Sequence, residues 1–154
     1  MIFRNNLFRF LLTSTICFLF SCRATKLVTD RKTRSIKELH FLGEYIIPYN
    51  EQFKNTTIGG LSGIDYDKEE NVYYLISDDW SQINPARFYT ARISLNEKGI
   101  DSVTFIETTP FLQPDGTVYP NTKKDPYHTP DPEAIRYNPL KKNIVWTSEG
   151  ERLI

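Results

Sequence analysis

An internal repeat is the sequence feature that most restricts how this chain can fold. The segment SGIDYDKEENVYYLISDD (62–79) aligns without a gap on EAIRYNPLKKNIVWTSEG (133–150), at a spacing of 71 residues. Both segments read as a strand, a polar turn and a second strand. The spacing predicts a repeated structural unit, with an accidental likeness between two hairpins as the alternative. Three aligned pairs are identical: Ile64 and Ile135, Tyr66 and Tyr137, and Ser77 and Ser148.

Two more strand candidates lie between the repeated segments, and no convincing amphipathic helix follows residue 36. Aromatic and β-branched residues, which suit pleated surfaces, dominate the candidates. We predict an all-β chain with about one and a half blades of a β-propeller, whose blades are four-stranded and antiparallel. The four strands of the complete blade are expected at 60–66, 72–78, 86–95 and 103–109.

The number of predicted blades is too small for a closed ring. Propellers have about 4–8 blades, and an isolated blade leaves apolar faces uncovered. We therefore expect residues 36–154 to be the N-terminal part of a longer propeller domain. The alternative is a naturally short chain that completes a ring with other chains. In a complete propeller, the strand candidate at 39–47 could be the outer strand that closes the ring with a distant terminal blade.

Residues 1–21 have the pattern of an export signal. Arg4 and Arg9 accompany an apolar run over 10–20, which is shorter than the about 20 apolar residues that span a bilayer. The run ends in Leu-Phe-Ser-Cys, which resembles a bacterial lipobox, so Cys22 is the predicted lipidation site. An ordinary signal peptide or an uncleaved anchor is the alternative. Residues 22–35 are polar and basic and are expected to form a flexible tether.

These features predict a lipoprotein of the bacterial cell envelope, on its periplasmic or cell-surface face. The lipid on Cys22 would attach it to the membrane. Basic and acidic residues balance at 19 each, so the chain has no basic field for nucleic acid. With the signal removed, Cys22 is the only thiol that remains. A disulfide framework is therefore excluded, and stability must come from a packed core or from metal.

Five motifs occur in order along the body of the chain: GGLSGIDYD (59–67), YYLISDD (73–79), PARFYTARI (85–93), DPEAIRY (131–137) and WTSEGE (146–151). Together they resemble the phytase-like propeller domain, whose members are described as having esterase-like phytase activity. The similarity spans residues 39–151. The resemblance implies an exported bacterial propeller and hydrolysis of phosphate esters. Because such folds host many functions, the reaction has to be argued from individual side chains.

Strand geometry predicts where charged side chains gather. Alternate connections between antiparallel strands emerge at the same edge of a blade. The turns at 68–71, 96–99 and 139–142 share one edge, so strand ends of both repeated segments meet at the other. The acids expected at that rim are Asp78, Asp79, Asp131, Glu133, Glu149 and Glu151, with Arg87, Lys123, Lys124 and His128 as basic neighbours.

Clustered carboxylates repel one another unless a cation neutralises them, and oxygen ligands suit Ca²⁺. We predict a Ca²⁺ site that polarises a phosphate or ester oxygen and activates a water molecule. Arg87 would hold a phosphate through two hydrogen bonds, and Glu133 or Asp131 would act as general base. For each acid the alternative is a turn cap or an ion pair with a nearby arginine. The predicted metal ligands are Asp78, Asp79 and Glu149.

The expected activity of the full-length protein is Ca²⁺-assisted hydrolysis of a small phosphate ester or other ester. Two alternatives remain open. One is a non-catalytic cell-surface module that binds a protein or a glycan, and that would tolerate Glu133→Gln. The other is a propeller of the sugar-lactone hydrolase type, which also uses acidic metal ligands. Turnover that chelation removes would favour hydrolysis, and a lactone assay would separate the last possibility.

Overall fold

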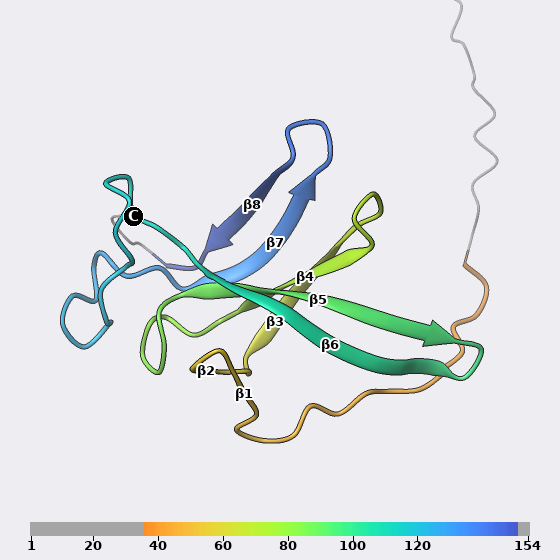
Figure 1. The fold of residues 1–154 in the computed structure, drawn as a ribbon. Helices are drawn as coiled ribbons and strands as arrows, with labels where there is room; N and C mark the ends of the chain where they lie inside the picture. Colours follow the sequence, from red (N-terminus) through yellow and green to blue (C-terminus); the bar gives the residue numbers. More distant parts are fainter. Residues whose placement is uncertain (1–35, 151–154) are drawn as a thin grey trace, which may run out of the picture. The chain divides into compact units, whose positions relative to one another are not determined.

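The structure, a computed structural model, describes residues 36–150, and every regular element in this range is a β-strand (Figure 1). The prediction of an all-β chain is therefore confirmed. All of the strands belong to the compact unit His40–Ile154. The predicted signal 1–21, the lipidation site Cys22, the tether 22–35 and Glu151 lie outside the described residues. No helix within residues 36–150 has the length and apolar character needed to cross a membrane.

One sheet contains the complete four-stranded unit. Its strands run antiparallel in the order β3-β4-β5-β6, so each strand pairs with its neighbour in sequence. This is the predicted blade, with boundaries that differ by a few residues. Its strands are β3 (Leu61–Asp67), β4 (Val72–Ser77), β5 (Arg87–Asn96) and β6 (Gly99–Pro110). Two hairpins accompany it: β1 (Gln52–Phe53) with β2 (Thr56–Thr57), and β7 (Pro132–Asn138) with β8 (Asn143–Ser148).

The repeated segments fold into equivalent hairpins, β3–β4 and β7–β8. The pairing register of the first shifts between Leu61 and Gly63, and that of the second shifts between Pro132 and Ala134. These positions are 71 residues apart in each case. A β-bulge is a specific local feature, so its recurrence at equivalent positions supports a true structural repeat over an accidental likeness.

The turns of the two hairpins are also built alike. The Asp67 carboxylate accepts two backbone N–H hydrogen bonds within its turn, and the Asn138 side-chain oxygen does the same 71 residues later. Each turn ends at a residue in the left-handed region, Asn71 with φ 53° and Lys142 with φ 50°. Short polar side chains that bind nearby N–H groups favour such turns, which explains why both sequences turn at this point.

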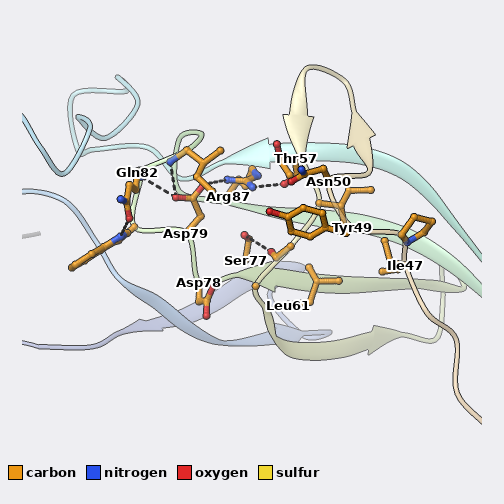
Figure 2. A pocket seen from close by; sticks show the side chains of 16 residues that line it. Ile47, Tyr49, Asn50, Thr57, Leu61, Ser77, Asp78, Asp79, Gln82 and Arg87 are labelled. Atoms are coloured by element: carbon orange, nitrogen blue, oxygen red, sulfur yellow. Dashed lines mark hydrogen bonds and ion pairs between the residues drawn. The ribbon is translucent and has the colours of Figure 1, made fainter.

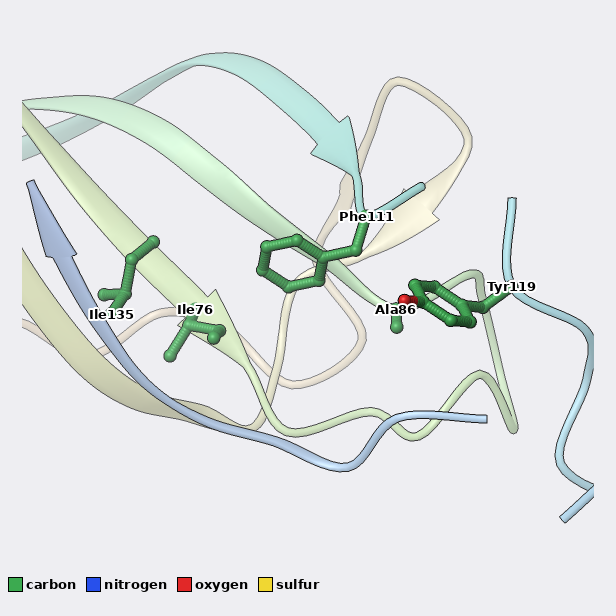
Figure 3. Close-up of a cluster of buried hydrophobic side chains, with 5 residues drawn as sticks. All are labelled: Ile76, Ala86, Phe111, Tyr119 and Ile135. Carbon is green, nitrogen blue, oxygen red and sulfur yellow. The ribbon is translucent and has the colours of Figure 1, made fainter. Parts of the chain in front are cut away.

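The hydrophobic core lies where the hairpin β7–β8 packs against the four-stranded sheet. Ile76 of β4 and Ile135 of β7 are fully buried there together with Phe111 (Figure 3). The Trp146 ring stacks on Phe111 with centroids 4.1 Å apart. Such aromatic pairs contribute about 0.5–1.5 kcal/mol beyond the burial of their area. Packing between the two repeated units therefore holds them in a fixed relation.

β7 also lies close beside β3. The Ser62 hydroxyl donates to the Glu133 carbonyl oxygen at 2.9 Å, and the Tyr137 N–H donates to the Asp65 carboxylate at 2.7 Å. A Cβ atom at Gly63 would lie 3.3 Å from the same Glu133 carbonyl oxygen. The glycine therefore permits the close approach that places Glu133 next to the first repeated unit.

The connection between β6 and β7 is folded back onto the core. Phe111 and Tyr119 are buried, and Thr129 is fully buried with its hydroxyl donating to the Pro120 carbonyl at 3.1 Å. The Asn121 side-chain amide donates to the Ser81 carbonyl at 2.6 Å. These contacts fix the path of the chain into β7, and with it the position of the acidic residues at the start of that strand.

The strand expected at 39–47 is not formed. Residues 36–48 have no regular structure, and apolar side chains such as Phe41, at 83% exposure, and Ile46, at 75%, remain exposed. An apolar segment becomes a strand only where a neighbouring strand provides hydrogen-bond partners, and none of the strands described pairs with it. The prediction of a regular strand was wrong for these residues, because the distant terminal blade with which it was expected to pair is not among the described strands.

Candidate functional site

Equivalent backbone hydrogen bonds place the acids of the two repeated units at one rim. The Asp78 N–H, just after β4, donates to the Gly60 carbonyl at 2.8 Å. The Glu149 N–H, just after β8, donates to the Asp131 carbonyl at 2.9 Å. Both pairs of residues are 71 positions apart. The rim predicted from strand geometry is thus built by one pattern that is used twice.

Four carboxylates at this rim share one electrostatic environment. Burial raises the pKa of Glu133 above its usual range, and the negative charges of Glu149, Asp131 and Asp78 raise it further. A hydrogen bond with Glu149 acts in the same direction. We call Asp78, Asp131, Glu133 and Glu149 the acidic rim. A carboxyl group whose pKa is raised above its usual range by neighbouring charges is a candidate for proton transfer at a functional site.

Asp79 faces a different environment from its neighbour Asp78, and the two side chains point in different directions (Figure 2). Its carboxylate is 8% exposed and accepts hydrogen bonds from three N–H groups of the turn that follows, at 2.8–3.1 Å. Burial alone would raise the pKa of Asp79, but these hydrogen bonds and one from Arg87 lower it overall. Asp79 therefore lies apart from the acidic rim as the anion of a buried ion pair.

Arg87 is the cation of that pair, 2.8 Å from Asp79 and only 3% exposed. Its Nε donates to the Tyr89 hydroxyl at 2.7 Å, and its Nη2 donates to the Thr57 carbonyl at 2.6 Å. Nη1 also reaches the Pro85 carbonyl at 3.2 Å. Because Arg87 donates its hydrogen bonds to other groups of the protein, it is better suited to holding Asp79 and the backbone of Thr57 in place than to the phosphate contact predicted from sequence.

The acidic rim carries the negative charge that a metal site needs, but its side chains are not arranged to hold a metal ion. Between residues 36 and 150, no group of three or more His, Cys, Asp or Glu side chains is arranged to hold a metal ion. Of the predicted Ca²⁺ ligands, Asp78 and Glu149 belong to the rim, whereas both Asp79 oxygens accept hydrogen bonds within the ion-pair network. The predicted bases Glu133 and Asp131 are at the rim.

A pocket of about 610 Å³ adjoins the rim (Figure 2). Its walls come from Ile47–Asn50, Thr57–Leu61, Ser77–Trp80, Gln82, Ile83 and Arg87. Asp78 lines this pocket and also belongs to the acidic rim, so the two are continuous. Gly60 has a φ of 56°, and a Cβ atom there would collide with the Asp78 carboxylate. Glycine at this position therefore lets Asp78 take its place.

Sequence reasoning did not foresee the pocket. Its apolar lining comes partly from residues 47–50, which begin at the last residue of the strand predicted at 39–47. The Gly59-Gly60 pair was a usable signal, because a glycine pair between polar and apolar segments permits a close approach of the backbone. The three wall segments become neighbours only through the fold.

Comparison with known proteins agrees with the motifs. The family model described as "Phytase-like: Esterase-like activity of phytase" matches residues 56–154, which is more than half of the chain. The matched range contains both repeated units and all four residues of the acidic rim. No curated protein and no solved structure matches the chain significantly.

Proposed function

Because this chain belongs to the phytase-like family, we propose that it takes part in ester hydrolysis at the acidic rim. The observation that carries the proposal is the convergence of carboxylates from both repeated units around Glu133, whose pKa they raise. A lone surface carboxylate has no such environment, and perturbed pKa values gather at functional sites.

Glu133 is the general base in this proposal. Its ionised carboxylate accepts a proton from a water molecule, whose oxygen attacks the carbonyl carbon or the phosphorus of the ester. The bond to the leaving alkoxide breaks, and the proton held on Glu133 passes to the leaving oxygen. Asp131 lies within the same environment and is the second candidate for the base. General-base catalysis of this kind contributes about 10²–10⁴-fold to the rate.

Hydrolysis is tested with 4-nitrophenyl butyrate and 4-nitrophenyl phosphate. Glu133→Gln keeps the shape of the side chain and removes the base, so kcat should fall by about 10²-fold or more. Glu70→Gln, in the turn between β3 and β4 at the opposite edge, is the matched control and should leave kcat unchanged. Wild-type rates in Glu133→Gln would refute the role of Glu133, whereas binding without any turnover by the wild type would favour a non-catalytic binding module.

Ca²⁺ is proposed as the cation that relieves the repulsion at the acidic rim. Asp78 and Glu149 would hold it, and Asp79 would join them only by leaving its pair with Arg87. Bound Ca²⁺ would polarise the oxygen of the ester. The support is chemical: carboxylate oxygens are its preferred ligands, and like charges already raise the pKa of Glu133.

Calorimetric titration with Ca²⁺ tests this part of the proposal. The double variant Asp78→Ala/Glu149→Ala should lose binding that the wild type shows. Glu69→Ala/Glu70→Ala removes the same charge at the opposite edge and should retain binding. Equal affinity in the two double variants would place Ca²⁺ elsewhere or show that it binds without a specific site.

Export and lipid attachment complete the proposal. They are supported by the charged and apolar pattern of residues 1–21 and by the Leu-Phe-Ser-Cys sequence that ends at Cys22. A lipid on Cys22 would hold the acidic rim at the membrane surface of the cell envelope. The polar stretch 22–35 would then act as the tether between the lipid and the sheet.

A further inference from the structure

The pocket beside the acidic rim has a mainly apolar lining. Seven of its side chains are aliphatic or aromatic: Ile47, Pro48, Tyr49, Ile58, Leu61, Trp80 and Ile83. Trp80 is 39% exposed and Ile83 is 71% exposed, so both present apolar surface to solvent at the pocket. A volume of about 610 Å³ lies within the range of small-molecule pockets, about 300–1,000 Å³. The lining suits an apolar group of a small molecule.

The charges around the pocket disfavour an anion. Arg87 is the one Lys or Arg among the described residues that line it, and Asp79 neutralises that charge at 2.8 Å. Asp78 adds a carboxylate to the wall, and the rest of the acidic rim continues from it. Proteins recognise phosphate groups through accessible Arg, Lys and N–H donors. A compound with several phosphates would therefore meet repulsion here.

We infer that the pocket holds an uncharged apolar group of the ester, an aryl ring or a short alkyl chain, while the ester bond lies at the acidic rim. This inference rests on the proposed function and names its substrate class. It places neutral carboxylic esters, and phosphate esters with a large apolar group, ahead of polyphosphorylated substrates. Asp78 connects the two parts, because it belongs both to the pocket wall and to the rim.

Binding of two compounds that cannot be hydrolysed tests the pocket directly. One is 4-nitroanisole, which is neutral, and the other is 4-nitrobenzylphosphonate, which carries the same ring and an anionic group. Calorimetry on the complete chain, with a chelator present, excludes metal bridging. We expect saturable binding of the neutral compound and binding of the phosphonate at least about tenfold weaker, since like charges repel. Equal or tighter binding of the phosphonate would overturn the inference.

A charge change at the pocket gives a matched pair of variants. Ile83→Lys places a cation at an exposed lining position, whereas Leu140→Lys does so at the turn between β7 and β8, where the side chain is 95% exposed. Ile83→Lys should shift the affinity ratio toward the phosphonate by about fivefold, the size of one charge interaction near the surface. Leu140→Lys should leave the ratio unchanged, and an equal shift in both variants would contradict the location.

The two proposals fail in different ways. One outcome is that the wild type hydrolyses no ester and still binds 4-nitroanisole more tightly than the phosphonate, with Ile83→Lys shifting the affinity ratio toward the phosphonate. In that case the proposed function fails and the pocket assignment stands. If the wild type hydrolyses 4-nitrophenyl butyrate and 4-nitrophenyl phosphate but Ile83→Lys changes neither rate, the inference fails and the proposed function stands.

Discussion

Asp78 and Asp79 show how far individual residues could be assigned from sequence. Both follow β4, so both were predicted to lie at the rim. N–H groups of the turn Ser81–Asn84 donate hydrogen bonds to the Asp79 carboxylate. Arg87 of β5 forms a buried ion pair with the same carboxylate. The end of a predicted strand indicates that the acids following it lie near the rim. Which of two adjacent acids is buried depends on donors from a turn and a strand, which local sequence does not reveal.

Asp79→Asn should lower stability at neutral pH by about 3–5 kcal/mol, because it leaves the Arg87 charge buried without a partner. The lowered folded-state pKa of Asp79 means that the pair stabilises the fold above the usual Asp pKa of about 3.9. This stabilisation is lost as pH falls through the lower folded-state value. Urea unfolding across that range measures the difference between the variant and the wild type.

The control is Glu107→Gln, which breaks the pair with Lys54 in which both side chains are about half exposed, at 46% and 52%. Such exposed pairs contribute little, so its unfolding curve should stay close to that of the wild type. An Asp79→Asn variant that is as stable as Glu107→Gln at neutral pH would contradict a structural role for the buried pair.

The raised pKa of Glu133 predicts a characteristic pH dependence. A base must be ionised, so the acid limb of kcat/KM should lie above the usual Glu pKa of about 4.3. Glu133 affects the pH dependence of stability in the opposite direction to Asp79. Its contribution to stability is lost as pH rises from its pKa in the unfolded state through its higher pKa in the folded state. Carboxyl NMR titration reports the same pKa without any assay of turnover.

Glu149→Gln tests the cause of this shift. It removes a like charge that raises the pKa of Glu133, so the NMR midpoint and the acid limb should both move to lower pH. Glu70→Gln, outside the rim, should move neither. If the midpoint stays in place in Glu149→Gln, the coupling between these two carboxylates is absent.

At the scale of elements, the repeated hairpins and the four-stranded sheet could be predicted. Alternating residues, polar turns and a constant spacing are local signals, and the bulge between Leu61 and Gly63 recurs at its equivalent position. The strand at 39–47 could not be judged in this way, because a strand exists only with a partner. Local pattern identified strands that pair with sequence neighbours and failed where the partner had to come from elsewhere.

Gly63→Val tests the close packing of β3 on β7. The added atoms would meet the Ile76 side chain, where a Cβ alone would lie at 3.1 Å, and the backbone of β7 at 3.3 Å. Overpacking of this kind costs about 1–3 kcal/mol, and amide exchange in β7 should accelerate. Gly59→Val is the matched control, because no atom lies within 4 Å of a Cβ there. Equal stability of the two variants would show that β3 and β7 do not pack this tightly.

At the scale of the whole molecule, the acidic rim was within reach of sequence reasoning and the pocket was not. The rim follows from the direction of antiparallel strands, which the repeat already implies. The pocket needs side chains from three segments whose approach depends on tertiary contacts, including the pair of Asp79 with Arg87. Functional residues that lie at the ends of strands can be predicted from the strand pattern. A pocket lined by the connections between strands cannot, because its walls depend on tertiary contacts.

Lipid attachment at Cys22 is tested in bacterial cells by labelling with radioactive palmitate. Cys22→Ala should abolish the label and release the protein from the membrane fraction, since no thiol would remain at the proposed site. Cys17→Ala, which alters the other cysteine of the chain, should keep both the label and the membrane association. Undiminished labelling of Cys22→Ala would exclude the proposed attachment.

At the rim, the two equivalent units carry matching acids at Asp78 and Glu149 but differ at two other positions. Where the first unit has Gly60 and Ser62, the second has Asp131 and Glu133 at the matching positions. The residues that shape the hairpins play the same parts in both copies, as Asp67 and Asn138 do in their turns. The molecule therefore contains a duplicated frame in which the second copy carries two acids, Asp131 and Glu133, that the first copy lacks at the matching positions. Asp131→Gly together with Glu133→Ser would give the second copy the residues of the first at these two positions and should leave the β7–β8 hairpin intact.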